Sequence, residues 1–492
     1  MINKSIHNSL MFSLLLILAS CTGIKSQSIK TNTTSNSKPN ILFVLCDDLG
    51  YADVGFNGSK DIITPEMDKL ASNGTVFTSA YVAHPFCGPS RAGIMTGRYP
   101  HAYGSQFNIP ANSDVSAVSG IPLNETFISK VLQSSGYYTG AIGKWHLGES
   151  EEFHPNKRGF DDFYGFLGGG HEYFPSIYKA KYNQQVAAGN NNIWDYLKPL
   201  DHNGVEVHET EYITDALSRE AVRFVKDASN NEKPFFLYLA YNAPHTPLQA
   251  KEEDMKVFDG IKDKDRRTYA GMVYAVDRGV GQIVKTLKEI NQFENTLIVF
   301  LSDNGGRTDK GANNTPLRGV KGDTYEGGFR VPMFFHWPNK VAAGVHFDYP
   351  VSALDFYPTF ASLANAEISK EKELDGKNIW NDLSNKKAPY SREPIFAMRH
   401  RSGFSDVGVR QDEWKATKAY NGSWKLYNVD NDISEEKDLS SKYPKLLQDM
   451  ILKAEAWSKT HTEPRWFDPQ SLKKVWQEED MGEFKNTFKI SN

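Results

Sequence analysis

NILFVLCDDLG, the stretch at residues 40–50, indicates the fold class of this chain. Its five consecutive apolar residues at 41–45 are typical of a strand that is buried on both faces of a parallel sheet. Such a strand requires helices on both sides, because each face must be covered. Polar residues, Asp47 and Asp48, follow it directly. The stretch therefore predicts an α/β protein.

The rest of the chain up to about residue 372 repeats this alternation of apolar runs and helical stretches. We expect a large, mostly parallel sheet between two layers of helices. The predicted strands are 40–46, 137–142, 234–241 and 296–301, and the predicted helices are 65–73, 125–134, 213–227 and 265–290. After residue 375, strand candidates at 414–417 and 424–427 precede a predicted helix at 444–459, which indicates a smaller α+β subdomain.

A cluster of mainly polar residues follows each predicted strand. The clusters are Asp47-Asp48 and the segments 143–146, 242–245 and 302–306. Open α/β sheets bind ligands at the carboxyl ends of their strands. The four clusters are therefore expected to meet in one crevice.

The composition is that of an ordinary globular protein. Of 492 residues, 39% are hydrophobic and 24% charged, with a formal net charge of −4. This charge excludes a protein that coats nucleic acid. An anionic substrate would therefore need a local cluster of cations.

The N-terminus indicates export. Lys4 and His7 precede an apolar run at 10–19 that is too short to span a bilayer, which is typical of a signal peptide. The run ends in Leu18-Ala19-Ser20-Cys21, which resembles the lipobox of bacterial lipoproteins, although a chance cysteine after an ordinary signal peptide is the alternative. We predict a signal peptide at 1–21, a flexible tether at 22–38, and an outer-membrane lipoprotein anchored at Cys21 or a periplasmic protein.

The chain has three cysteines, so a disulfide framework is not expected. Cys46 ends the first apolar run and is interpreted as a buried strand residue. Cys87 lies between Pro85 and Gly88-Pro89, where neither strand nor helix interior is expected. A reactive role is therefore credible for Cys87.

Four residues of the polar clusters carry oxygen ligands, with no thiolate or imidazole among them. They are Asp47, Asp48, Asp303 and Asn304. Such a set suits a hard cation, most readily Ca²⁺, with Mg²⁺ left open. The Asp-Asp pair alone could be a helix cap or a solvated turn. Its recurrence as Asp303-Asn304 at a second strand end favours the metal site.

Cations accompany the candidate metal ligands. They are Arg91, Lys144, His146, His245 and Lys321. Singly, each could be a surface or core residue, but their joint placement suits a sulfuryl or phosphoryl group that develops charge during transfer.

The run Cys87-Gly88-Pro89-Ser90-Arg91, followed by Thr96-Gly97-Arg98, resembles the signature of the type I, formylglycine-dependent sulfatases of the alkaline phosphatase superfamily. Further matches lie in 40–55, 140–148, 243–245, 302–305 and 321–332, in the order that the family uses. The resemblance implies an alkaline phosphatase-like fold with a catalytic domain at 39–372. It also implies a C-terminal subdomain at 373–492 that carries a short antiparallel sheet.

The resemblance further implies a chemistry for Cys87. A formylglycine-generating (sulfatase-maturating) enzyme would convert Cys87 to formylglycine, 3-oxoalanine, whose hydrate attacks sulfur. Calcium would be held by Asp47, Asp48, Asp303, Asn304 and the modified Cys87. Arg91 would hold the hydrate, Lys144 would bridge it to the sulfate, and His146 would be the base that expels sulfate. His245 and Lys321 would bind sulfate and protonate the leaving alcohol, with Lys321 acidified by burial.

An exported sulfatase of this kind is expected to act on sulfated polysaccharides, such as ulvan, carrageenan or fucoidan. Candidate sugar contacts, each of which could instead be a salt bridge, are His171, Glu172, Asp201, His202, Arg307, Arg399, His400 and Arg401. Three alternatives stay open: a phosphate mono- or diester hydrolase, a catalytically silent glycan-binding lipoprotein, and a two-zinc alkaline phosphatase. The last is disfavoured because the histidines that zinc would need are missing from the metal-side residues.

Overall fold

The computed structural model describes residues 38–111, 119–385 and 393–478. The predicted signal peptide at 1–21, including Cys21, and residues 22–37 of the predicted tether lie outside the described residues. None of the helices in the described ranges combines the length and the apolar character needed to cross a membrane.

The main sheet has ten strands in the order β11-β2-β10-β9-β1-β8-β4-β5-β6-β7. Its centre is parallel and its outer strands are mixed. The central strands are β9 (Thr296–Ser302), β1 (Asn40–Cys46), β8 (Phe235–Ala240), β4 (Tyr138–Lys144) and β5 (Asp162–Phe166). The outer strands are β11 (Val345–Phe347), β2 (Thr75–Phe77), β10 (Met333–His336), β6 (Leu200–His202) and β7 (Val205–Val207). The predicted mixed, mostly parallel sheet is confirmed, and the four predicted strands are β1, β4, β8 and β9.

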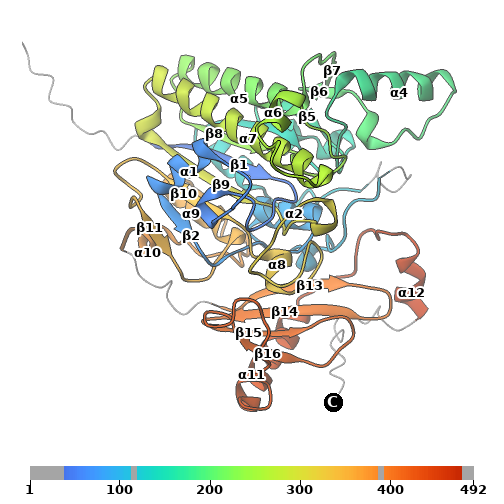
Figure 1. The fold of residues 1–492 in the computed structure, drawn as a ribbon, viewed down its shortest axis with the longest axis vertical. Helices are drawn as coiled ribbons and strands as arrows, with labels where there is room; N and C mark the ends of the chain where they lie inside the picture. The colour runs from blue at the N-terminus through green and yellow to red at the C-terminus, as the bar shows by residue number, and fades with distance from the viewer. Residues whose placement is uncertain (1–37, 112–118, 386–392, 479–492) are drawn as a thin grey trace, which may run out of the picture. The chain divides into compact units, whose positions relative to one another are not determined.

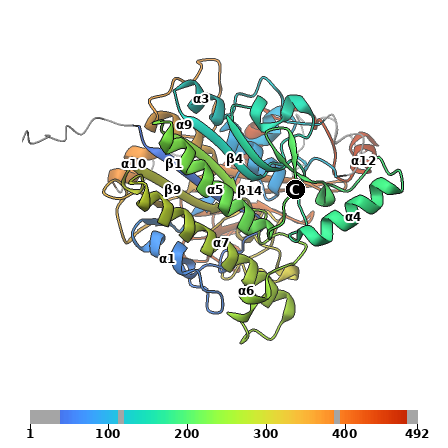
Figure 2. The ribbon, with the colours of Figure 1, turned by 90° about the horizontal axis from the view of Figure 1, so that it is seen from above.

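Helices cover both faces of this sheet (Figures 1 and 2). In β1, Ile41, Phe43 and Leu45 pack into one core layer, while Leu42 and Val44 pack into the other. One layer contains α2 (Cys87–Thr96), α3 (Ile128–Ser134) and α9 (Phe356–Leu363); the other contains α1 (Pro65–Ser72), α5 (Ile213–Asn230) and α7 (Lys264–Glu289). Burial on both faces explains why β1 is a continuous apolar run.

The C-terminal part forms a separate antiparallel sheet of four strands. These are β13 (Ile395–His400), β14 (Ser405–Gln411), β15 (Trp414–Lys418) and β16 (Lys425–Asn428), and α11 (Pro444–Ser458) packs against β14 and β15. The predicted short antiparallel sheet is confirmed, whereas the domain boundary near residue 373 stays a prediction. The remaining elements are β3 (Ala80–Tyr81), β12 (Val351–Ser352), α4 (Pro175–Ala187), α6 (Glu252–Lys256), α8 (Glu326–Phe329), α10 (Trp380–Asn385) and α12 (Leu472–Glu478).

The surroundings of Cys87 differ from the sequence expectation. Cys87 was expected to lie outside strands and helix interiors, and it is the first residue of a helix, α2, that the sequence analysis did not predict. Pro89 is tolerated there because the first turn of a helix needs no intrahelical N–H donors. The helix ends at Gly97, which adopts φ 67°. The N-terminus of α2 therefore presents Cys87 where backbone N–H groups favour an anion.

Candidate active site

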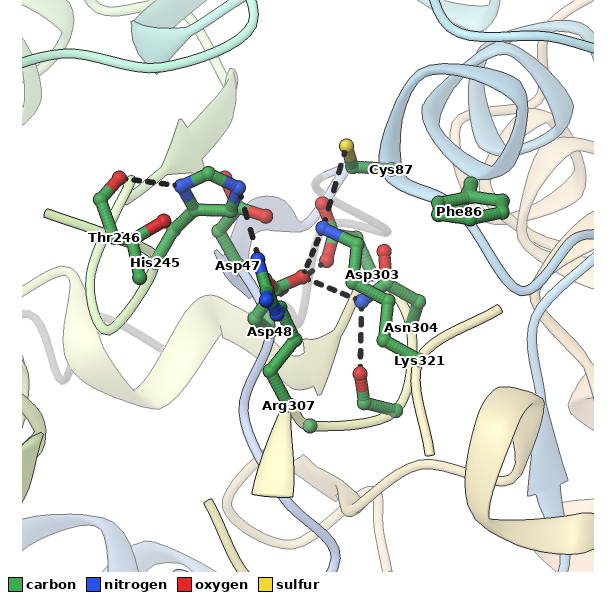
Figure 3. Close-up of polar contacts among 12 residues, drawn as sticks. Asp47, Asp48, Phe86, Cys87, His245, Thr246, Asp303, Asn304, Arg307 and Lys321 are labelled. Atoms are coloured by element: carbon green, nitrogen blue, oxygen red, sulfur yellow. Dashed lines mark hydrogen bonds and ion pairs between the residues drawn. The ribbon is translucent and has the colours of Figure 1, made fainter. Parts of the chain in front are cut away.

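The polar clusters meet at one end of the parallel strands, as predicted (Figure 3). Asp47 and Asp48 follow β1, Lys144 ends β4, His245 follows β8, and Asp303 and Asn304 follow β9. Cys87 and Arg91 come from α2, and Lys321 lies in the segment before α8. Residues far apart in the sequence thus share one buried site.

Arg91 and Lys144 bind the carboxylates on one side of the site. The Nε of Arg91 donates to Asp303 Oδ2 at 2.8 Å, and its Nη1 donates to the carbonyl of Lys144 at 2.9 Å. The Nζ of Lys144 lies 2.5 Å from Asp47 Oδ2. All of these side chains are 0% exposed. Their charges therefore act without screening by water.

Asp48 organises the other side of the site. Its Oδ1 accepts from Lys321 Nζ at 2.6 Å and from Asn304 Nδ2 at 2.7 Å. The residue adopts the left-handed region at φ 63°, which is uncommon for a residue other than glycine. Backbone strain of this kind is typical of a functional site.

Three buried oxygens in this cluster have no hydrogen-bond partner among the described residues. They are Asp47 Oδ1, Asp48 Oδ2 and Asn304 Oδ1. A buried oxygen without a partner is costly unless a cation or water satisfies it. Carboxylate and amide oxygens are the ligands that Ca²⁺ and Mg²⁺ prefer. The residues therefore fit a hard divalent cation.

The imidazole of His245, one of the cations expected to accompany the metal ligands, lies beside these oxygens. Ligand atoms of Asp47, Asp48 and His245 lie within 4.8 Å of one another. The Nδ1 of His245 is 2.7 Å from the carbonyl of Thr246, so it donates there, and Nε2 lies 3.7 Å from Asp48 Oδ2. His245 thus presents Nε2 to the site.

The carboxylates of Asp47 and Asp303 ionise unequally. Burial opposes ionisation of Asp47, but Lys144, His245 and Arg91 hold its pKa well below the ordinary value. Burial and the nearby charge of Asp47 raise the pKa of Asp303 to about 7. Like charges so close together ionise in full only when more positive charge joins them. This is a second indication that the cluster is built to hold a cation.

Cys87 lies within reach of two polar groups. Its Sγ is 3.9 Å from Lys321 Nζ (Figure 3). The same sulfur lies 3.6 Å from Asn108 Oδ1. Burial raises the pKa of the thiol, although Lys144 and Lys321 oppose the shift. An unmodified Cys87 is therefore a neutral, weak nucleophile at neutral pH.

Asn108 is a site residue that sequence reasoning missed. Its Oδ1 also accepts the backbone N–H of Gly88 at 2.9 Å. A Cβ on Gly88 would lie 2.9 Å from that oxygen, so this contact requires glycine. Because Asn108 follows no predicted strand, its sequence neighbourhood offers no signal.

His146 is neutral. Burial, Lys144 and Arg91 lower the pKa of its imidazole well below the ordinary value. A Cβ on Gly169 would lie 2.9 Å from its Nε2, so the glycine lets the chain pass close to the ring. A neutral imidazole agrees with the predicted role as a base.

The expectation that burial acidifies Lys321 is wrong. Burial does favour the neutral amine, but Asp48 at 2.6 Å outweighs it and raises the pKa of Lys321 above the ordinary value. Lys321 is therefore a permanent cation in this structure.

Several predicted sugar contacts do not reach the site. His171 is 0% exposed, and its ring nitrogens lie 2.6 and 2.8 Å from the carbonyls of Glu172 and Lys198. The carboxylate of Glu172, which is also buried, accepts from Lys181 and Gln249. The predicted sugar contacts of His171 and Glu172 are therefore wrong, because both side chains are committed to internal contacts.

The remaining candidate sugar contacts lie in different parts of the molecule. His202 pairs with Asp162 at 3.1 Å on β6, on the outer part of the sheet, and Asp201 lies on the same strand. Arg307 pairs with Asp309 at 2.6 Å and is near enough to Asp48 to feel its charge. Arg399, His400 and Arg401 line a cavity of about 290 Å³ that also includes Phe86 and Asn108.

Tyr196 is a second residue that sequence reasoning missed. Its ring stacks on Trp194 at 4.2 Å and lies 6.3 Å from the ring of His245. A Cβ on Gly170 would lie 2.2 Å from Tyr196 Cζ, so only glycine permits this approach. The run of glycines at 168–170 was the available signal.

Comparisons with known proteins agree with this geometry. The profile of the family described as Sulfatase matches residues 39–366, and the profile described as N-sulphoglucosamine sulphohydrolase, C-terminal, matches residues 321–459. Arylsulfatase J of Mus musculus is 31% identical over 90% of this chain and 80% of its own length. The uncharacterized sulfatase YdeN of Escherichia coli (strain K12) is 36% identical over 73% of this chain and 68% of its own length.

A solved structure is more similar. The crystal structure of Ps i-CgsB in complex with k-i-k-neocarrahexaose has 59% sequence identity and a TM-score of 0.90, and the match covers 92% of this chain and 100% of that chain. Three observations indicate a sulfatase: the strand-end carboxylates, the Cys87 motif and the family profile. The chain belongs to the sulfatase family and is a sulfuric ester hydrolase.

Proposed function

We propose that this sulfatase removes sulfate from sulfated carrageenan oligosaccharides. The observation that carries the proposal is the 59% identity to Ps i-CgsB, whose crystal structure holds k-i-k-neocarrahexaose. The buried cationic site at the strand ends supports the same substrate class, because a sulfate ester is a compact anion.

The catalytic group of the proposal is a formylglycine made from Cys87 by a formylglycine-generating enzyme. The neutral thiol in the structure is a weak nucleophile, which supports this conversion. Ca²⁺, with Mg²⁺ as the alternative, would be held by the oxygens of Asp47, Asp48, Asp303 and Asn304. Such a cation would polarise the sulfate ester and stabilise negative charge at the nucleophile.

The chain's own residues have separable tasks in the proposal. Arg91 and Lys144 hold Asp303 and Asp47 in place, and Lys321 offers a permanent positive charge to a sulfate oxygen. Neutral His146, beside Gly88, would accept a proton at Nδ1, which has no hydrogen-bond partner among the described residues. His245 keeps a proton on Nδ1 for the carbonyl of Thr246, so Nε2 would give a proton to the leaving alcohol from the imidazolium form, which burial disfavours and Asp47 and Asp48 favour.

The N-terminal sequence supports export and a lipid anchor at Cys21 as further parts of the proposal. The anchor would hold the enzyme at the outer membrane, where polysaccharide fragments are met. A Cys21→Ser variant that stays in the membrane fraction of the producing cells would remove the lipid anchor from the proposal.

The central test measures free sulfate released from carrageenan oligosaccharides by calcium-loaded enzyme whose Cys87 peptide has been weighed by mass spectrometry. Conversion to the aldehyde and release of sulfate are expected, and Cys87→Ala should abolish release. Aryl phosphate turnover above sulfate turnover would favour a phosphoesterase. Tight glycan binding without release by fully converted enzyme would favour a glycan-binding protein.

A further inference from the structure

One cavity borders the nucleophile without belonging to the cluster of strand-end residues. It has a volume of about 290 Å³ and lies between the segments that flank Cys87 and β13. Phe86 and Asn108 form the wall nearest to Cys87, and Arg399 and His400 of β13 form another. Asp468 and Leu472 close it from the C-terminal segment.

Arg399 is the unusual residue of this cavity. Its Nη1 donates to the carbonyl of Gly322 at 2.9 Å, and its guanidinium lies 4.6 Å from the centroid of the Phe86 ring. Within the described ranges, no carboxylate oxygen lies within 4.0 Å of its nitrogens. A half-buried guanidinium with spare N–H donors and no anionic partner is suited to bind an anion.

Arg401, two residues further, shows the contrast. Its guanidinium pairs with Asp406, lies 3.3 Å from Asp323, and packs 4.7 Å from the ring of Tyr420. Among the described residues, carboxylates thus form ion pairs with Arg401 but not with Arg399.

Local backbone shape keeps Arg399 beside the reaction site. Gly322 adopts φ 87°, and a Cβ there would lie 2.5 Å from Arg399 Nη1 and 2.9 Å from Phe86 Cζ. Lys321 precedes this glycine, and its Nζ lies 6.0 Å from the centroid of the same Phe86 ring. Both cations therefore lie within 6.0 Å of one ring centroid, and this ring belongs to the residue before Cys87.

The rest of the cavity suits a sugar ring. Phe107 and Leu472 offer apolar surface, while Asn108 and Asp468 offer acceptors for hydroxyl groups. Mixed walls of this kind match a sulfated sugar better than a free inorganic anion.

We infer that this cavity is a subsite for a second sulfated sugar, and that Arg399 binds its sulfate while the reacting sulfate lies at Cys87. The inference rests on the proposed function and deepens it. It makes the substrate a chain with sulfate on two sugars close to each other, and it makes Arg399 a specificity residue.

The test compares two carrageenan oligosaccharides that share the reacting sulfate and differ only in the second sulfate on a neighbouring sugar. Wild type should prefer the doubly sulfated one in kcat/KM. Arg399→Gln should lower kcat/KM on that substrate by about tenfold or more, mainly through KM, since a charge-assisted hydrogen bond is lost. On the singly sulfated substrate the change should be less than about twofold. Arg399→Lys should fall between the two, because it keeps the charge and loses the planar fork.

Arg267→Gln is the matched control, since this partly exposed arginine of α7 pairs only loosely with Asp259 at 3.9 Å. It should behave as wild type on both substrates. An equal loss on both substrates for Arg399→Gln would overturn the inference, because Arg399 would then act through Gly322 on Lys321. No loss on either substrate would also overturn it. If Arg399→Gln does not fold, the same comparison with Arg399→Lys decides.

Failure of the proposed function gives a different result. Wild-type enzyme would then release sulfate from neither oligosaccharide, whatever residue stands at position 399. If the preferred second group is a uronate carboxylate, an oligosaccharide carrying one in place of the second sulfate would be turned over faster, and the assignment to sulfate would be wrong.

Discussion

Two buried ionic clusters in this molecule differ in whether their own residues complete them. In the cluster that joins α8 to the C-terminal sheet, Lys415 Nζ lies 2.9 Å from Glu326 Oε1 and 3.0 Å from Glu435 Oε1. In the active site, Lys144 Nζ lies 2.5 Å from Asp47 Oδ2, but the second oxygen of Asp47 has no hydrogen-bond partner among the described residues. All five side chains are 0% exposed.

This difference between the two clusters shows that burial and charge alone do not identify a functional site. Both clusters bury carboxylates around a lysine, and Arg330 adds a further cation to the structural one at 2.9 Å from Glu326. Among the described residues, both clusters contain buried atoms that lack a hydrogen-bond partner. In the structural cluster, Glu326 Oε1 and Glu435 Oε1 still lie 2.9 and 3.0 Å from Lys415 Nζ. In the active site, ligand atoms of Asp47, Asp48 and His245 instead converge within 4.8 Å of one another. Convergence of unpartnered oxygens on one point, without a cation of the chain between them, is therefore the feature that indicates a ligand.

The largest expected effect is on stability and comes from the completed cluster. Lys415→Met would leave Glu326 and Glu435 buried without their shared cation, which should lower the free energy of unfolding by about 3–5 kcal/mol. Denaturant unfolding measures this change. The kcat of the folded fraction should stay near that of wild type, and a loss of kcat with unchanged stability would contradict the contrast between the clusters.

The equivalent change in the active site should affect chemistry more than stability. Lys144→Met should lower kcat by about 100- to 1,000-fold, the usual result of removing one charge-stabilising donor. The free energy of unfolding should fall less than for Lys415→Met, because Arg91 also approaches Asp47 at 3.7 Å. Sulfate release and denaturant unfolding on the same two variants make the comparison. Equal kcat losses would show that the clusters are not distinct.

Glu435 gives the completed cluster a pH dependence. Burial raises the pKa of its carboxyl to about 7, with Lys415 opposing and Glu326 adding to the shift. Between about pH 4.5 and 7 the unfolded chain releases this proton while the folded chain keeps it. The contribution of Glu435 is therefore fully present below pH 4.5 and is lost as the pH rises through 7.

Glu435→Gln should remove this dependence, because its amide does not titrate. The difference in unfolding free energy between wild type and variant should change by up to about 3 kcal/mol between pH 4.5 and 7, with wild type losing relative stability as the pH rises. Denaturant unfolding across this range measures it. A constant difference would show that Glu435 is ionised throughout.

The incomplete cluster should respond to metal instead. Adding Ca²⁺ to chelator-treated enzyme at about 100 times its Kd should stabilise the fold by about 2.7 kcal/mol. Thermal unfolding with and without Ca²⁺ measures the change. Asp48→Asn should lose most of it, whereas Glu435→Gln, in the completed cluster, should keep it. An equal response to Ca²⁺ in both variants would place the cation elsewhere.

The sequence predicted those parts of the structure that depend on short patterns. The strand predicted at 40–46 has the same bounds as β1. Burial on both faces of the sheet gives such a strand a continuous apolar run, which is easily recognised in the sequence. The convergence of Asp47, Lys144 and Asp303 followed from the rule for parallel strand ends. The outer strands β6 and β7 were missed because exposed and half-exposed residues interrupt their apolar pattern.

Other parts of the site depend on contacts between distant segments. Asn108 reaches Cys87 from a loop 21 positions away, and Tyr196 reaches His245 through packing against Gly170. His171 and Glu172, which follow the glycine run, looked like ligands but are fully used by internal contacts. Which polar residues keep a free atom is a property of the folded chain, not of local sequence.

The smallest expected effect comes from that glycine run. Gly169→Ala would place a Cβ 2.9 Å from Nε2 of His146, so the ring must shift within its buried pocket. A displacement of a few tenths of an ångström should lower kcat by about tenfold, because catalytic groups act only in a narrow geometry. Gly260→Ala is the control, since nothing lies within 4 Å of its added Cβ. Steady-state kinetics on both variants decide the matter: unchanged kcat in Gly169→Ala would mean that the position of His146 does not limit the reaction.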